Sequence, residues 1–273
     1  MTRRPVATIC RVLGMGRATA YRPGKPRARR YERRDDPVVY AQLRDVLRDR
    51  GSYGYRRARV LVQRAYGVRY NRKRIQRVMR MTGLSLPIRG RRHNGRPHRG
   101  RVTQEQPDRR WCTDGFEILC WNGQIVCAAF ALDCCDREAM AHVARIGDLT
   151  SADIQRLMRK AVFGRFGAAG PPSPVQWLSD NGSVFTALET VIEAERLNLV
   201  PITTPVASPE SNGMAEAFVN TLRRDYIDGA DLSTAAKVIE QMAGWIADYN
   251  GFAPHSALGE KSPVEYRREL VTT

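Results

Sequence analysis

The order of strand-like and helix-like segments after Arg109 limits most strongly how this chain can fold. Residues 111–119, 124–132 and 138–146 carry apolar or alternating patterns that predict three strands. The Trp-Asn-Gly run at residues 121–123 predicts a hairpin turn between the first two. Helices and strands then alternate, at residues 151–166 (helix), 175–178 (strand), 184–196 (helix), 199–203 (strand), around Glu216 (helix) and 233–249 (helix). We therefore expect an α/β fold with a mixed central sheet covered by helices.

The apolar stretch at residues 175–178 stops at Asp180, and the turn residues Asn181 and Gly182 follow it. A carboxylate at the tip of a buried strand lies where a rigid sheet meets solvent. This position suits a metal ligand and is unfavourable for an unpaired charge. Asp180 is therefore expected to have partners from other parts of the chain.

Two other acids are candidate partners of Asp180. Asp114 lies inside the strand-like stretch at residues 111–119, and Glu216 lies in the first turns of a helix. Between Asp180 and Glu216 lie 35 residues. The three carboxylates come from separate elements, so only the folded sheet can bring them together.

Helical geometry predicts how Glu216 is oriented. At about 100° per residue, one apolar stripe is expected to face the sheet, and a polar arc lies beside it. Glu216 on this arc therefore leans towards the strand tips and away from the core. The stripe contains Ala215, Phe218, Leu222 and Tyr226, and the arc contains Glu216, Asn220 and Arg223.

Three converging carboxylates suit hard divalent cations. Mg²⁺ prefers oxygen ligands in octahedral geometry, and two such ions roughly 3.5–4 Å apart stabilise the attacking and leaving oxygens of a phosphoryl transfer. Alternatives remain open from the residues alone. Each acid can be a turn or N-cap residue, and spacing does not rank the competing acids Asp133, Asp136 and Glu138 below Asp114.

The charge distribution indicates a polyanionic partner. The net charge of +17 divides unequally, because residues 1–110 hold 32 Lys and Arg against 7 Asp and Glu, and the remainder holds 13 against 21. A strongly basic N-terminal part favours nucleic-acid binding. An Arg-rich coding bias explains why only 5 of the 45 basic residues are lysine. It does not explain the asymmetry between the two parts.

Residues 37–83 predict three helices, at residues 37–50, 56–66 and 72–81, with Asn71 capping the third. A short basic third helix in such a unit suits the DNA major groove. The alternative is a solvated basic helix packed in a small bundle. The basic residues of the third helix are Arg72, Lys73, Arg74, Arg77 and Arg80.

The expected organisation has four parts: a basic N-terminal arm (1–36), a helical DNA-binding domain resembling a helix-turn-helix (37–83), a basic linker (84–106) and a catalytic core (107–270). In the arm, two short helical pieces flank Gly14. In the linker, Arg91 and Arg92 either follow a phosphate backbone or belong to a simple connection between domains.

The cysteines and apolar runs favour a reduced, cytoplasmic protein. None of the six cysteines forms a C-x-x-C pair, and most lie in apolar strand-like surroundings, so we expect them to be free and structural. The four histidines are too scattered to complete a zinc site. The longest strongly apolar run, residues 125–132, is far too short to span a bilayer, so no membrane association is expected.

Five motifs follow one another in the chain: WCTDG at 111–115, FALDCCDRE at 130–138, WLSDNGS at 177–183, SPESNGMAE at 208–216 and PHSALG at 254–259. Together they resemble the integrase-type (DDE) transposases of bacterial insertion sequences with two overlapping frames, and specifically the second-frame product. The resemblance spans about residues 37–268.

The resemblance implies a ribonuclease-H-like core, shared with retroviral integrases, whose triad falls on Asp114, Asp180 and Glu216. It implies catalysis with two Mg²⁺ ions, for which Mn²⁺ can substitute. Arg223 stands seven positions after Glu216, where many relatives carry Lys. Asp133 and Asp136 match family positions outside the triad and are expected to be supporting residues. Asn181, Asn212 and Arg223 are expected to position the DNA backbone near the metals.

The implied reaction is DNA cleavage at the element end, followed by attack of the freed 3′-hydroxyl on a second phosphodiester. The implied partners are the terminal inverted repeats, target DNA and further copies of the chain on DNA. Because the family's active protein usually joins both frames, the first-frame product is also an expected partner. The expected location is the bacterial cytoplasm, associated with the nucleoid.

Two other functions fit the same residues. A nuclease of this fold hydrolyses DNA without joining it to a new strand, and a joining assay with a pre-cut end separates the two. A regulator made from an inactive frame binds DNA and cuts nothing. Replacing Asp180 with Asn distinguishes this regulator from an enzyme. An enzyme would lose DNA cleavage and keep DNA binding, whereas the regulator has no cleavage to lose.

Overall fold

The computed structural model describes residues 5–21, 33–87, 103–203 and 213–272. The chain divides into two compact units, Met1–Val39 and Tyr40–Thr273. In the first, α1 (Val6–Val12) and α2 (Arg17–Tyr21) flank Gly14, whose φ of 62° a glycine adopts without strain. The expected pair of short helices at this place is confirmed.

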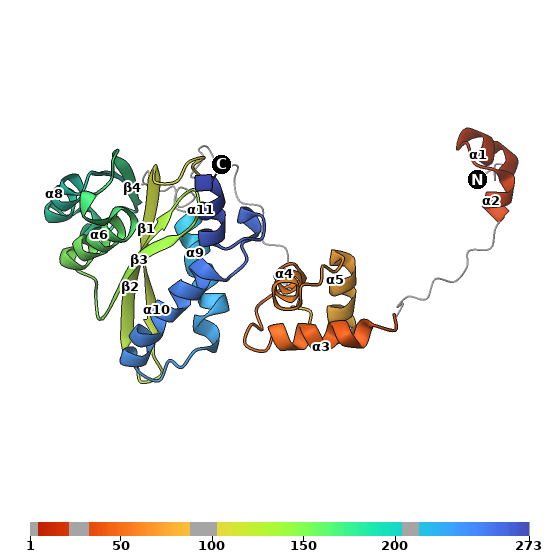
Figure 1. The fold of residues 1–273 in the computed structure, drawn as a ribbon, viewed down its shortest axis with the longest axis horizontal. Coiled ribbons are helices and arrows are strands. Elements are labelled where there is room, and N and C mark those ends of the chain that lie inside the picture. The colour runs from red at the N-terminus through yellow and green to blue at the C-terminus, as the bar shows by residue number, and fades with distance from the viewer. Residues whose placement is uncertain (1–4, 22–32, 88–102, 204–212, 273) are drawn as a thin grey trace. The chain divides into compact units, whose positions relative to one another are not determined.

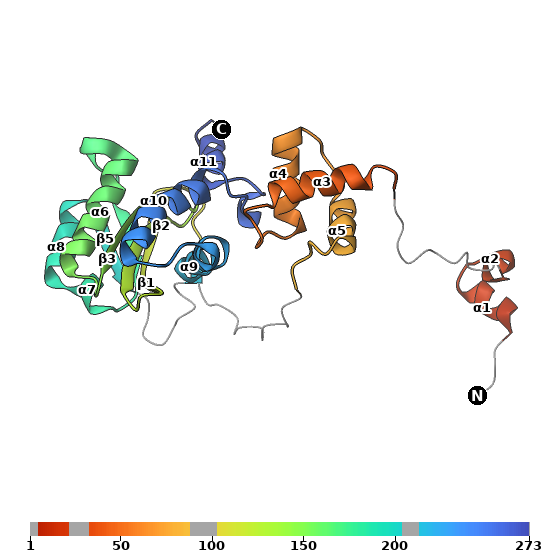
Figure 2. The same cartoon turned by 90° about the horizontal axis from the view of Figure 1, so that it is seen from below.

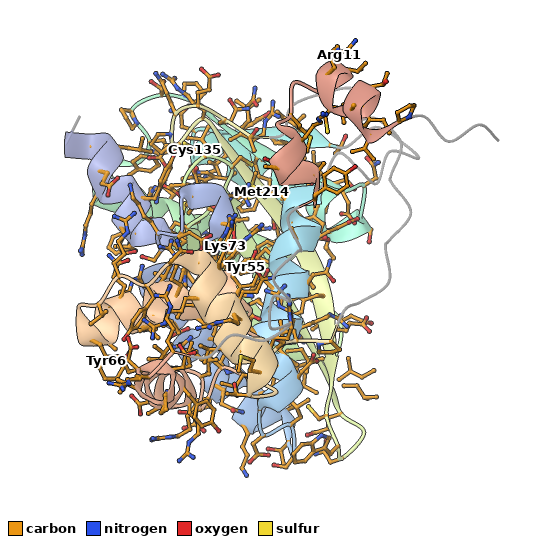
Figure 3. All side chains as sticks on the ribbon, turned by 90° about the vertical axis from the view of Figure 1, so that its right-hand side faces the viewer. Arg11, Tyr55, Tyr66, Lys73, Cys135 and Met214 are labelled. Atoms are coloured by element: carbon orange, nitrogen blue, oxygen red, sulfur yellow. The ribbon has the colours of Figure 1, made fainter. Side chains whose placement is uncertain are left out.

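Between α2 and the sheet, the described residues form three helices: α3 (Asp36–Val46), α4 (Tyr55–Tyr66) and α5 (Arg72–Met81). Asn71 caps α5, because its side-chain oxygen accepts a hydrogen bond from Lys73 N at 2.8 Å. Gly67 ends α4 with a φ of 68°. Tyr55 and Tyr66 mark the two ends of α4 (Figure 3). The prediction of three helices is confirmed, except that α3 ends at Val46 and not at residue 50.

The central sheet has five strands in the order β3-β2-β1-β4-β5 (Figure 1). β2 (Ile125–Asp133) pairs antiparallel with both β1 (Arg110–Leu119) and β3 (Ala139–Ile146). β4 (Val175–Ser179) lies parallel to β1, and β5 (Leu199–Thr203) lies parallel to β4. The predicted mixed sheet is confirmed, and each of its five predicted strands is present.

Helices cover both faces of this sheet (Figures 1 and 2). On one face α6 (Ser151–Phe166) buries its apolar side chains against Trp111 and Trp177. On the other face α9 (Gly213–Asp225) and α10 (Ala235–Gly251) pack against β1, β2 and β3. Each face therefore has its own apolar core, as expected for a sheet covered on both sides.

Two features of the helices differ from expectation. The predicted helix at residues 184–196 is divided into α7 (Ser183–Thr186) and α8 (Leu188–Arg196), because Ala187 has an extended ψ of 139°. A further helix, α11 (Pro263–Thr272), was not predicted. The described residues also contain three 3₁₀ turns: η1 (Gly167–Ala169), η3 (Ile227–Gly229) and η4 (Ser256–Leu258).

All six cysteines are free and buried, as expected. Across the described ranges, none of the helices combines the length and apolar character needed to cross a bilayer. The α6 helix begins with a capping box, in which Thr150 and Asp153 exchange side-chain and backbone hydrogen bonds. This box explains why the helix starts where the sequence predicts.

A buried arginine joins four acids between the sheet and α6. The side chain of Arg165 is 1% exposed and lies 2.6 Å from Asp108, 2.5 Å from Asp136, 2.5 Å from Glu138 and 3.5 Å from Asp133. Backbone N–H groups of Cys135 and Asp136 also donate to Asp133. The cluster therefore ties the segment before β1, the β2–β3 connection and α6 together.

Replacing Arg165 with Met is expected to lower the free energy of unfolding by about 3–5 kcal/mol, because it leaves buried carboxylates without their cation. Urea denaturation measures the change. Arg156→Ala is the control, since the Arg156 side chain is 53% exposed in its pair with Asp153, and it should cost less than about 1 kcal/mol. Equal effects of the two substitutions would contradict the prediction.

Candidate active site

The pairing of β1 with β4 brings Asp114 and Asp180 side by side. In this parallel pair Trp111 stands opposite Trp177, and Cys112 stands opposite Leu178. Continuing this register by two residues sets Asp114 level with Asp180, just beyond the end of β4. Since side chains alternate along a strand, both acids point to the face of Cys112 and Leu178, which α9 and α10 cover.

The loop after β4 holds the Asp180 carboxylate. Its Oδ1 accepts a hydrogen bond from Gly182 N at 3.0 Å. A Cβ at position 182 would lie 3.0 Å from that Oδ1 and 3.3 Å from the Phe185 ring. Glycine is therefore needed here so that the backbone can approach the carboxylate closely. In β1, Asp114 Oδ1 accepts a comparable bond from Gly115 N at 2.9 Å.

Glu216 reaches the same face from α9. The predicted stripe is confirmed for Ala215, Phe218 and Leu222, which are at most 2% exposed in the core, and Tyr226 packs partly buried against it. Glu216 itself is exposed in the first turn of α9. The helix therefore presents this carboxylate at the edge of its buried stripe, as its position on the helix predicts.

The charges of Asp180 and Glu216 act on Asp114. Burial raises the pKa of Asp114 to about 6, a hydrogen bond from Gly115 N opposes this rise, and the charges of Asp180 and Glu216 add to it. Within the described residues, however, no three His, Cys, Asp or Glu side chains form a group tight enough to hold a metal ion. Asp114 therefore lies within electrostatic range of the other two acids, but the three carboxylates do not form a closed coordination shell.

The competing acids occupy a different place. Asp133 and Asp136 are fully buried and, with Glu138, lie in the cluster around Arg165. Arg267 also contacts Glu138 at 3.2 Å. Burial and then the neighbouring charge of Asp136 raise the pKa of Asp133 to about 6. These acids form ion pairs with Arg165 and Arg267. The spacing of the acids in the sequence could not show these partners.

The structure locates some of the other predicted site residues. Arg223, on α9, donates to the backbone oxygen of Glu117 on β1 at 3.2 Å, and Asn181 directly follows Asp180. Arg91, Arg92 and Asn212 lie outside the described residues.

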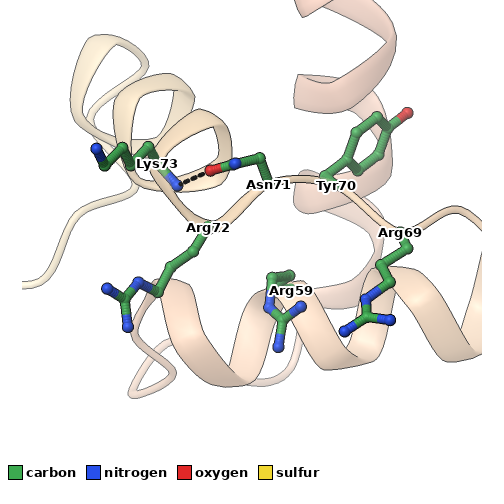
Figure 4. Close-up of a pocket in the computed structure, with 6 residues that line it drawn as sticks. All are labelled: Arg59, Arg69, Tyr70, Asn71, Arg72 and Lys73. Atoms are coloured by element: carbon green, nitrogen blue, oxygen red, sulfur yellow. Dashed lines mark hydrogen bonds between the residues drawn. The ribbon is translucent and has the colours of Figure 1, made fainter.

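The start of α5 borders a basic pocket of about 540 Å³ (Figure 4). None of its six lining residues is acidic, and four are cationic. In the described part of the chain, the Arg59, Arg69, Arg72 and Lys73 side chains make no ion pair. The pocket is lined by Arg59, Arg69, Tyr70, Asn71, Arg72 and Lys73.

Sequence reasoning found Arg72 and Lys73 in this pocket but missed Arg59 and Arg69. Arg59 lies on α4 and Arg69 lies in the following turn, so only the packing of α4 against α5 brings them to the start of α5. Arg74 of the predicted set lies 5.2 Å from the centre of the Tyr70 ring. Arg77 and Arg80 follow along α5.

Comparison with protein families gives three matches. Residues 104–209 and 199–263 match two family models, both described as "Integrase core domain", and residues 33–92 match one described as "HTH-like domain". The two integrase-core matches include Asp114, Asp180 and Glu216.

Solved structures similar to the chain include a simian T-cell lymphotropic virus intasome (14% identity, TM-score 0.49, 83% of this chain and 73% of that chain). The catalytic core of BIV integrase is 19% identical, with a TM-score of 0.39, over 60% of this chain and 97% of that chain.

Curated relatives from Escherichia coli are closer in sequence. The Transposase InsD for insertion element IS2A/D/F/H/I/K is 42% identical over 246 residues, which cover 88% of this chain and 82% of the relative. The Transposase InsD for insertion element IS2D of strain K12 has the same identity and coverage. The chain therefore belongs to the transposases of insertion elements, polynucleotidyl transferases that combine an HTH-like domain with a ribonuclease-H-like integrase core.

Proposed function

We propose that this transposase cuts DNA at the ends of an insertion sequence and joins the freed 3′ ends to target DNA, using Asp114, Asp180 and Glu216 as its catalytic triad. The observation that carries the proposal is the β1–β4 register, which sets Asp114 level with Asp180 on the sheet face that α9 covers. The raised pKa of Asp114, to which burial and then the charges of Asp180 and Glu216 contribute, supports it. Three carboxylates from separate elements on one sheet face repel one another, and this repulsion is unfavourable unless a cation neutralises it.

The residues fit divalent metal ions. All three side chains offer carboxylate oxygens, the donors that Mg²⁺ and Mn²⁺ prefer. Two bound ions would stabilise the attacking and leaving oxygens of the phosphoryl transfer. Asp180 is already oriented by the Gly182 N–H, and Asp114 must lose its proton to serve as a ligand. Arg223, Asn181 and Asn212 are proposed to hold the DNA backbone beside these acids.

The basic residues around α5 are proposed to grip the terminal inverted repeats. Cations at phosphates supply affinity, and side chains along a groove-bound helix read the bases. We assign Arg59, Arg69, Arg72 and Lys73 to phosphates because they surround one pocket that has no acidic lining residue. Arg74, Arg77, Arg80 and the linker residues Arg91 and Arg92 complete the proposed DNA contacts.

We further propose four parts of the chain, residues 1–36, 37–83, 84–106 and 107–270, and assign DNA binding to the second. The chain acts as a homo-oligomer on DNA, together with the first-frame product. Since its substrate is chromosomal or plasmid DNA, it works in the bacterial cytoplasm at the nucleoid.

The catalytic assignment is tested with Asp180→Asn and Glu216→Gln on DNA that carries the sequences flanking this reading frame. Each variant should lose cleavage and joining by on the order of a thousand-fold, while DNA affinity in a gel-shift assay stays within a factor of about two. Glu240→Gln, which changes an exposed glutamate of α10, is the matched control and should cut normally.

Persistent cleavage by purified Asp180→Asn protein would show that the triad is wrong. A wild-type protein that cuts but never joins a pre-cut end would identify a nuclease. A wild-type protein that binds the DNA and cuts nothing with Mg²⁺ or Mn²⁺ would identify a regulator.

Asp114→Asn should stabilise the fold at neutral pH. Because the folded pKa is about 6 and the ordinary value is 3.8, the folded state binds an extra proton in this window, so stability falls as pH rises from about 4 to about 6. Above about pH 6 the stability does not fall further from this group, and the stability already lost is not regained. Removing the charge should therefore raise the free energy of unfolding by about 1–2 kcal/mol at pH 7.5, after allowance for partial exposure.

Urea denaturation at several pH values measures this effect. The difference between wild type and Asp114→Asn should vanish below about pH 4, where Asp114 is protonated in both states. Asp228→Asn, at an exposed position, is the control and should show no such pH dependence. A destabilised Asp114→Asn protein at pH 7.5 would contradict the charge repulsion argued above.

The pocket assignment is tested by the salt dependence of DNA binding. Arg59→Gln and Arg69→Gln should each reduce the slope of log affinity against log salt concentration by about one, since one phosphate contact is lost. Arg56→Gln, on α4 but outside the pocket, is the control and should leave the slope unchanged. Unchanged slopes for both pocket variants would remove Arg59 and Arg69 from the interface.

A further inference from the structure

The last residue of α9, Asp225, is a point of attachment between the core and α4. Its carboxylate, 1% exposed, accepts hydrogen bonds from Arg57 Nη1 at 2.6 Å and from Ser52 Oγ at 2.6 Å. Arg224 donates to the same carboxylate from within α9, at 2.7 and 2.8 Å. Asp225 is therefore a buried anion whose hydrogen-bond partners come from both sides of the contact.

A second, partly buried contact lies on α10. Arg50 donates two hydrogen bonds to Asp248, at 2.7 and 3.0 Å, in the bidentate geometry that makes arginine–carboxylate pairs specific. Tyr226, the residue after α9, donates to the same carboxylate at 2.8 Å. The Asp225 and Asp248 contacts are thus linked through neighbouring residues of one turn.

A third contact extends the attachment along α4. Arg64 donates to Glu265 of α11 and to the backbone oxygen of Phe252, each at 2.5 Å. The guanidinium groups of Arg50 and Arg64 both lie over the Phe252 ring, at 4.7 and 5.6 Å from its centre. These three arginine contacts fix both the position and the orientation of α4 relative to the core, whereas a single ion pair would leave α4 free to rotate about it.

We infer that the Arg57–Asp225 pair is a positioning element of the reaction: it sets the distance between DNA held at the α4–α5 pocket and the triad. Two residues of α4, separated by a single residue, support this. Arg57 contacts Asp225, and Arg59 lines the basic pocket. On α9, Asp225 lies nine residues after Glu216, or about 14 Å along the helix. This inference rests on the proposed function.

A positioning role for the Arg57–Asp225 pair affects which phosphodiester is cut, whereas a role only in the stability of the fold does not. If α4 and α9 form one rigid connection, the phosphodiester that reaches Glu216 is chosen by how far it lies from the phosphate bound at Arg59. A loosened connection lets neighbouring phosphodiesters reach the triad. A misplacement of about 1 Å can lower a rate by on the order of a hundred-fold, so both the rate and the position of the cut should change.

The experiment uses the full chain, element-end DNA labelled at one end, and a sequencing gel. Arg57→Gln should lower the rate of cleavage at the correct phosphodiester about tenfold and spread cuts over adjacent positions, with DNA affinity changed less than about twofold. Arg57→Lys, which keeps the charge, should restore most of the rate and the single cut. Leu157→Ala, in the core on the opposite face of the sheet, controls for lost stability and should keep a single cut.

Ser52→Ala removes one hydrogen bond to the same carboxylate and gives a milder test if Arg57→Gln protein does not fold. A single, correctly placed cut at the wild-type rate in a folded Arg57→Gln or Ser52→Ala protein would overturn the inference. Spread cuts in Leu157→Ala would also overturn it, because lost stability alone would then be sufficient. Cleavage by Asp180→Asn would instead overturn the proposed function, so the two failures are distinguishable.

Discussion

The parallel pairing of β1 with β4 is the constraint on which the rest of the site depends. It aligns Cys112 with Leu178, and so sets the two aspartates that follow on one face at the end of the shorter strand. Without it, 65 residues of intervening chain separate Asp114 from Asp180. The helices pack on the two faces of the sheet that this pairing forms. α6 and α8 cover one face, and α9 brings Glu216 to the other.

The protein deals with its buried charges in two ways. Around Arg165, acids and arginines satisfy one another, and the cluster braces the connections of the sheet. At Asp114, burial raises the pKa, and neighbouring charges of the same sign raise it further. The first arrangement stabilises a fold, whereas the second is stable only when something positive neutralises it. The contrast separates supporting acids from candidate catalytic acids.

Particular residues show how far sequence reasoning reached. Local patterns located the strands, the Asn71 cap and the apolar stripe of α9, since each depends on neighbours within one or two turns. The helix α11 was missed although its start carries a local signal, because Ser262 and Glu265 exchange the hydrogen bonds of a capping box. Arg59 and Arg69 are different, since no motif marked them and only the packing of α4 on α5 brings them to one pocket.

The sequence by itself determined the family and the order of the strands along the chain, because motifs and local periodicity lie in consecutive residues. It also proposed three acids, through the resemblance to that family. Only the tertiary structure decided that Asp133, Asp136 and Glu138 surround a buried arginine and that α4 is tied to the end of α9. The physical reason is that the role of a charged side chain depends on the groups it contacts in the folded protein. Those partners lie 27 to 168 residues away in the chain.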